Sequence, residues 1–160
     1  MRIAIAQLDY TIGAFEANLE AMTIAVERAR RAAADLVVFT ELATTGYPPG
    51  DLLERRDFVD HNLTQLERIA HLSDDGLGIL AGFVDRNETG TGKALHNAVA
   101  LCHRGTVAGR YFKCLLPTYD VFDEARYFES GADARPLNFK GVRIGVSVCE
   151  DVWADPDLDG

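Results

Sequence analysis

Three residues of different chemistry each follow an apolar segment that is typical of a β-strand: Glu41, Lys113 and Cys149. The segments that precede them are LVVF, TVAGRYF and VRIGVSV, respectively. In α/β folds, functional side chains gather where strands end. If these strands lie side by side in one sheet, we expect a carboxylate, an amine and a thiol to converge at one edge.

These three groups form a working set for acyl transfer. A thiol is mostly protonated at neutral pH, because its ordinary pKa is about 8.5. Glu41 would accept this proton while the Cys149 sulfur attacks a carbonyl carbon. The Lys113 ammonium and a backbone N–H, such as that of Glu150, would stabilise the resulting oxyanion. An amide is a suitable substrate, because the glutamate can pass its proton to the leaving nitrogen.

Each residue also has a purely structural interpretation. A glutamate after a strand is commonly a solvated loop residue, and a lysine at a strand end commonly lies at the surface. A free cysteine such as Cys149 is often only a small apolar residue of the core. The combination of the three favours a catalytic site, and the convergence of the side chains is the point to be tested.

The overall composition excludes several classes of protein. The 160 residues are enough for one domain with a hydrophobic core, and 48% of them are hydrophobic. The 16 basic and 25 acidic residues give a net charge of −9, which argues against binding to nucleic acid or to an anionic membrane surface. No segment reads as a signal peptide or as a membrane span, so we expect a cytoplasmic protein.

The three cysteines do not indicate a metal site or a disulfide framework. Their number is odd and no C-x-x-C spacing occurs. Cys102 and His103 are adjacent and would point to opposite faces of a strand, which is a poor start for metal ligation. We therefore interpret Cys102 and Cys114 as structural residues and expect no metal.

Hydrophobic periodicity predicts a single α/β domain. The predicted strands are 2–8, 36–39, 77–84, 95–101, 106–112 and 142–148, and the predicted helices are 15–34 and 58–72. Helices between the early strands and a later hairpin indicate a mixed sheet covered by helices. A covering helix is expected after the strand 142–148 and is not seen, which suggests a fragment of a longer domain.

Three sequence blocks, in chain order, resemble the nitrilase (carbon–nitrogen hydrolase) superfamily. They are TELATTGYPPGDLL, FKCLLPTYDVFDEARYFESG and GVSVCEDVW. The more specific resemblance is to the N-terminal glutaminase domain of glutamine-dependent NAD synthetases. It implies an αββα sandwich of which residues 1–160 form the N-terminal part, with the C-terminal part of the domain and the whole synthetase domain absent.

The resemblance also implies roles for individual residues. Glu41 matches the general base, Lys113 the lysine that stabilises the oxyanion, and Cys149 the nucleophile. Glu124 resembles a second glutamate that helps to hold the site. A thiol at Cys114, directly after the lysine, departs from the expected pattern.

Two aromatic residues match positions near the substrate. Tyr119 corresponds to a tyrosine that lines the glutamine pocket, and Trp153 lies where an aromatic residue borders it. The alternative for the aromatic residues of this region is a packed loop without contact to substrate.

The activity implied by the resemblance is hydrolysis of L-glutamine through a cysteine thioester, which supplies ammonia for NAD synthesis from nicotinic acid adenine dinucleotide. No cofactor is expected for this half, whereas ATP and magnesium belong to the synthetase half. The expected partners are L-glutamine, the synthetase domain and further copies in a homo-oligomer. Two alternatives remain: a stand-alone amidase for another small amide, and a catalytically silent fragment.

Overall fold

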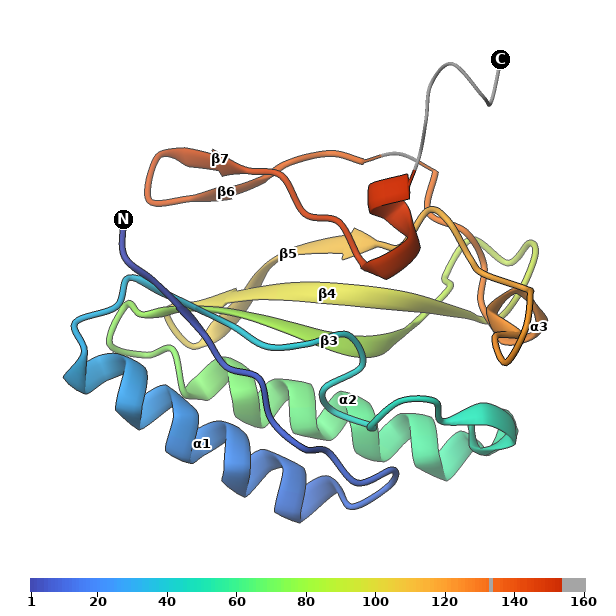
Figure 1. The fold of residues 1–160 in the computed structure, drawn as a ribbon, viewed down its shortest axis with the longest axis horizontal. Helices are drawn as coiled ribbons and strands as arrows, with labels where there is room; N and C mark the ends of the chain where they lie inside the picture. Colours follow the sequence, from blue (N-terminus) through green and yellow to red (C-terminus); the bar gives the residue numbers. More distant parts are fainter. Residues whose placement is uncertain (133, 154–160) are drawn as a thin grey trace.

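The fold was obtained as a computed structural model, which describes residues 1–132 and 134–153 (Figure 1). Its centre is a mixed five-stranded sheet in which neighbouring strands follow the chain order. The strands are β1 (Ile3–Ile5), β2 (Leu36–Val38), β3 (Gly78–Arg86), β4 (Leu95–His103) and β5 (Thr106–Phe112). The first three strands are parallel, and β3, β4 and β5 are antiparallel. The mixed sheet that the sequence predicts is therefore confirmed.

Two helices, α1 (Phe15–Arg31) and α2 (Arg56–His71), cover one face of this sheet (Figure 1). Their apolar residues recur every three or four positions, which places them on one side of each helix. The core between helices and sheet includes Leu19, Met22, Val26, Leu66, Ile69 and Ala70 from the helices and Val37, Ile79, Ala81 and Phe83 from the strands. The strand residues alternate along the chain, because only every second side chain faces the helices.

The opposite face of the sheet is partly covered by a hairpin of β6 (Leu137–Phe139) and β7 (Val142–Ile144) (Figure 1). Its turn uses positive φ angles at Lys140 and Gly141. The ring of Phe139 lies directly on the backbone of β3, since a Cβ at Gly78 would stand 2.6 Å from it. The described residues thus form a helical layer, a mixed five-stranded sheet and a second, small sheet, which together make a mixed α/β fold.

The predicted strand 142–148 is wrong in its extent. Pairing stops at Ile144, and residues 145–148 have no regular structure before the short helix η2 (Cys149–Trp153). The apolar alternation has another cause. Ile144, Val146 and Val148 pack into a second hydrophobic core, although no strand lies beside residues 145–148. This core lies between the two sheets and includes Leu80, Leu101 and Phe139. The cysteine therefore follows an irregular segment rather than a strand.

Smaller differences concern the remaining boundaries. The predicted strand 2–8 is reduced to β1, and the irregular segment after Lys113 contains the short helix α3 (Glu124–Tyr127). The loop after β2 contains the short helix η1 (Gly50–Glu54). Both helices α1 and α2 and the hairpin of β4 and β5 lie where the sequence predicts them. Within the described part of the chain, no helix is both long enough and apolar enough to traverse a lipid bilayer.

Asn62 of α2 replaces a missing strand beside β3. The strand β2 pairs with β3 only as far as Leu80, so the backbone groups of Val84 have no strand neighbour on that side. Val84 N donates to Asn62 Oδ1 at 3.0 Å, and Asn62 Nδ2 donates to Val84 O at 2.6 Å. Asn62 Oδ1 also accepts a 2.7 Å hydrogen bond from Thr44 Oγ1. One buried amide thereby connects α2, β3 and the loop after β2.

Replacement of Asn62 by alanine is expected to lower the free energy of unfolding by about 2–4 kcal/mol, because two buried backbone groups of Val84 lose their partner. The Thr44 hydroxyl also loses the shorter of its two contacts with acceptors. Chemical denaturation followed by circular dichroism measures this change. Asn138→Ala is the matched control, because Asn138 is exposed on β6. Equal stability of the two variants would contradict the role assigned to Asn62.

Candidate active site

Glu41 is brought to the site by a chain segment that crosses over β3. Phe39 N bonds to Leu80 O at 2.8 Å and Thr44 N to Gly82 O at 3.2 Å, so the backbone between them lies against this strand. A Cβ at Gly82 would lie 2.3 Å from Leu42 N. Because the clash is with backbone atoms, only glycine at this position allows the Glu41 segment to pass so closely.

Lys113 is the centre of the candidate site. Its backbone N–H bonds to Asn97 O at 2.9 Å, which continues the pairing of β4 and β5 past Phe112. The side chain is 0% exposed, and its ammonium donates to Glu41 Oε1 at 2.8 Å and to both carboxylate oxygens of Glu124 at 2.9 Å. The predicted contact between Glu41 and Lys113 is present, and Glu124 joins it.

The electrostatics of this cluster keep Lys113 charged. Burial alone would lower the pKa of the ammonium, because it removes water from a cation. The hydrogen bonds and charges of Glu41 and Glu124 outweigh this effect, and the pKa of Lys113 is raised above its usual value. Two carboxylates and one ammonium leave a formal charge of −1 on the cluster.

Two further side chains hold the carboxylates and were not predicted from the sequence. Tyr47 donates from its hydroxyl to Glu124 Oε1 at 2.9 Å, and Asn97 Nδ2 donates to Glu41 Oε1 at 2.6 Å and to Glu124 Oε2 at 3.3 Å. The sequence does contain a signal for Asn97, because it is a polar residue inside the apolar segment that forms β4. Tyr47 lies within the GYPPGDLL block, but nothing in that block indicates its partner.

Cys149 begins the helix η2 with a positive φ of 47° and is exposed. Within the described residues, its thiol forms no hydrogen bond to Glu41 or Lys113, although the charges of both act on it. Partial burial and the Glu41 carboxylate raise the pKa of the Cys149 thiol, whereas Lys113 opposes this rise. A thiol with a raised pKa keeps its proton at neutral pH, so a nucleophilic role requires a base.

The two predicted substrate-binding residues are exposed. Tyr119 is 56% exposed, packs edge-on against Phe122, and donates from its hydroxyl to Glu150 Oε2 at 2.8 Å. Trp153 is 74% exposed. Tyr119 therefore lies near the turn that carries Cys149, but neither residue encloses a pocket within the described part of the chain.

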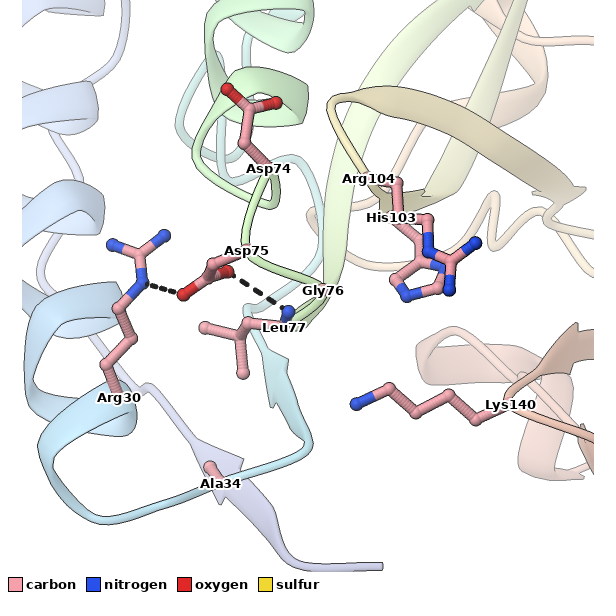
Figure 2. Close-up of a pocket in the computed structure, with 9 residues that line it drawn as sticks. All are labelled: Arg30, Ala34, Asp74, Asp75, Gly76, Leu77, His103, Arg104 and Lys140. Carbon is pink, nitrogen blue, oxygen red and sulfur yellow. Dashed lines mark hydrogen bonds and ion pairs between the residues drawn. The ribbon is translucent and has the colours of Figure 1, made fainter.

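Of two hollows in the surface, one lies away from the cluster and the other adjoins it. A hollow of about 610 Å³ lies beside the loop between α2 and β3 and the tips of both hairpins (Figure 2). There Arg30 Nε bonds to Asp75 Oδ2 at 2.6 Å, a link between α1 and that loop (Figure 2). A smaller hollow of about 200 Å³ adjoins Tyr47 and Glu124 and is bounded by Pro48, Pro49 and Phe122. Among the residues described, no group of three or more His, Cys, Asp or Glu side chains is arranged to hold a metal ion.

Replacement of Lys113 by methionine is expected to lower the free energy of unfolding by about 3–5 kcal/mol, because it leaves two facing carboxylates without their cation. The double variant Lys113→Met/Glu124→Gln should recover part of this loss, since one of the carboxylate charges is then also removed. Urea denaturation of the single and double variants measures the coupling.

Arg55→Met serves as the control for this experiment. Arg55 pairs with Asp57 at 2.8 Å, but both side chains are mostly exposed. Water and salt screen such a pair, so its removal should leave the unfolding midpoint unchanged. A double variant no more stable than Lys113→Met would show that repulsion between the carboxylates is not the cause of the loss.

The chain is similar in sequence to glutamine-dependent NAD(+) synthetases. It is 43% identical over 156 residues to the enzyme of Synechocystis sp., an alignment that covers 96% of this chain and 28% of that protein. The chain spans 26–29% of the length of the curated relatives it matches.

Solved structures show the same fold. The glutamine-dependent NAD+ synthetase of Acinetobacter baumannii in complex with ADP superposes with a TM-score of 0.87 at 32% identity, covering 98% of this chain and 29% of that chain. A mutant of the amidase from Nesterenkonia sp. AN1, showing the result of Michael addition of acrylamide at its active site cysteine, has a TM-score of 0.78 at 26% identity, covering 99% and 60%.

The family to which this chain belongs is shown by a match over nearly the whole sequence. The carbon-nitrogen hydrolase family model matches residues 2–157, which include all six residues predicted for the site. The resemblance noted from the three sequence blocks is thereby confirmed, and this chain belongs to the carbon-nitrogen hydrolase family.

Proposed function

We propose that this chain is the N-terminal part of a domain that hydrolyses the amide of L-glutamine and supplies ammonia for glutamine-dependent NAD synthesis. The observation that carries the proposal is the enclosed Lys113 ammonium, held between Glu41 and Glu124 beside the turn that begins at Cys149. The similarity to glutamine-dependent NAD(+) synthetases supports glutamine as the substrate.

In the proposed reaction, the Cys149 sulfur attacks the amide carbon of glutamine while Glu41 takes the thiol proton. A base is needed at this step, because the raised pKa keeps the thiol protonated at neutral pH. The carbonyl oxygen becomes an oxyanion, and the Lys113 ammonium and the backbone N–H of Glu150 are the donors assigned to it.

The tetrahedral intermediate then collapses. The C–N bond breaks as Glu41 returns the proton to the leaving nitrogen, and ammonia departs from a glutamyl thioester on Cys149. Glu41 next takes a proton from water, whose oxygen attacks the thioester carbon. The C–S bond breaks, the proton returns to the sulfur, and glutamate is released.

Glu124 has a supporting role in this scheme. Both of its oxygens hold the Lys113 ammonium, and Tyr47 and Asn97 fix its orientation in turn. The cation is therefore positioned before the substrate arrives, which is the condition for effective stabilisation of an oxyanion. Tyr119 and Trp153 are assigned to the border of the glutamine pocket.

We assign the other components of NAD synthesis to parts of the protein outside residues 1–160. The hydrolysis uses no cofactor, because thiol, base and cation are all side chains of this chain. ATP and magnesium are assigned to a synthetase domain of the parent protein, which would also accept the ammonia. We further propose a homo-oligomer in the cytoplasm.

A second candidate is hydrolysis of another small amide by a stand-alone amidase. It is favoured by the structural similarity to the Nesterenkonia amidase, of which this chain covers 60%. The two candidates differ in whether glutamine occupies the site.

Incubation with a diazo-ketone analogue of glutamine is expected to place one adduct on Cys149, because the electrophilic carbon would occupy the position of the amide carbon. Intact mass and peptide mapping locate the adduct. Excess glutamine should protect the thiol, and Cys149→Ala should abolish the adduct, whereas Cys114→Ala should retain it.

Two other results would decide against the proposal. An adduct on Cys149 that acetamide prevents and glutamine does not would favour the amidase. Equal labelling of Cys102, Cys114 and Cys149, or none, would show that these residues do not form a glutamine site and would support the silent fragment.

A further inference from the structure

The Asp151 carboxylate accepts four hydrogen bonds, two on each oxygen. The backbone N–H groups of Cys114 and Leu115 donate to Oδ1 at 2.9 and 2.8 Å. The Tyr111 hydroxyl and the Val148 backbone N–H donate to Oδ2 at 2.7 and 2.9 Å. Both oxygens are thus fully used inside the protein, and Asp151 has no free oxygen for a substrate.

These four bonds join the two parts of the chain that carry the proposed cation and nucleophile. Cys114 and Leu115 directly follow Lys113, and Val148 directly precedes Cys149. Residues 145–148 do not pair with a strand, so backbone pairing does not position the turn that begins at Cys149. The carboxylate supplies the connection that a sheet would otherwise provide.

The backbone at Cys149 also needs such a connection. Its φ of 47° lies in a region that residues other than glycine rarely adopt, and such conformations persist only where the surroundings hold them. The Asp151 backbone N–H bonds to Val148 O at 3.0 Å and closes the turn around the cysteine. One residue therefore holds this turn both through its backbone and through its side chain.

We propose that Asp151 is a positioning residue, which rests on the proposed function: its carboxylate fixes the Cys149 thiol relative to Lys113 and Glu41. It touches neither substrate nor reacting atoms and acts through the two segments that it joins. Its removal leaves the ion cluster of Lys113 intact, because the Lys113 ammonium donates to Glu41 and Glu124. Asn97 also donates to Glu41, and none of these bonds involves Asp151.

The chemistry of the four donors makes Asp151→Asn a sharp test. Three of the donors are backbone N–H groups, which cannot reverse their direction. An asparagine keeps only one acceptor oxygen, and its NH₂ group would face either Val148 N–H or the N–H groups of Cys114 and Leu115. The side chain keeps its size and shape, but at least one segment loses its anchor.

The first measurement is steady-state hydrolysis of glutamine by the full-length protein that contains this chain. Asp151→Asn is expected to lower kcat about 100-fold, since a displacement of about 1 Å between reacting groups can cost that much. Asp57→Asn, an exposed aspartate of α2, should retain wild-type kcat.

The second measurement separates positioning from loss of stability. The rate of alkylation of Cys149 by iodoacetamide is followed against pH, with the adduct identified by peptide mass. In the wild type, partial burial and the charge of Glu41, with a smaller effect of Glu124, outweigh Lys113 and raise the pKa of the thiol. Displacement of the turn should therefore move the midpoint of the profile down toward that of a free thiol, whereas a merely less stable fold would leave it in place.

The outcomes are distinct. A folded Asp151→Asn protein with wild-type kcat and an unchanged alkylation midpoint would overturn the positioning role. A wild-type enzyme without glutamine hydrolysis or glutamine protection of Cys149 would instead overturn the proposed function, whatever the variant does.

Tyr111→Phe decides the question if Asp151→Asn does not fold. It removes one of the four donors, leaves the carboxylate in place, and is expected to lower kcat about threefold to tenfold, because the remaining three bonds hold the turn less tightly. Unchanged kcat and alkylation midpoint in this folded variant would overturn the proposal.

Discussion

The structure of the candidate site depends on one interaction, the ion pair cluster of Lys113 with Glu41 and Glu124. An ammonium that is removed from water is strongly unfavourable unless its charge and all its donors are satisfied. Here the two carboxylates satisfy it, and they come from segments that are far apart in the sequence. The cluster therefore requires that the loop after β2, the end of β5 and the helix α3 occupy fixed positions.

The surrounding fold meets this requirement with few residues. The absence of a side chain at Gly82 lets the Glu41 segment lie on β3, and Asn62 ties the same segment to α2 and to the open edge of that strand. Asn97 lies on β4 and bonds to both carboxylates. The site is thus built on the rigid sheet, although two of its three charged residues lie in loops or in a short helix.

The sequence predicts most of this arrangement, and the physical reasons for its failures are specific. The sequence predicts helices α1 and α2 and the central strands, because helices and strands differ in the spacing of their apolar residues. The strand before Cys149 is predicted too long, because an apolar alternation reports burial of one side and not pairing with a neighbour. Asn62, Asn97, Gly82 and Asp151 could not be assigned partners, since each acts through contacts between segments that are distant along the chain. The roles of Glu41, Lys113 and Cys149 remain predictions that rest on chemistry and resemblance. The structure adds the contact between Glu41 and Lys113.

The charge balance of the cluster favours one kind of cysteine chemistry over another. In sites where a thiol pairs with an imidazolium, the thiolate exists before the substrate binds. Here two carboxylates face one ammonium, and the pKa of Cys149 is raised rather than lowered. A thiolate formed in advance would be repelled by the excess negative charge. In the proposed mechanism the proton therefore leaves sulfur only as the carbon–sulfur bond forms. Glu41 is then neutral, and the cluster can accept the negative charge of the oxyanion beside Lys113.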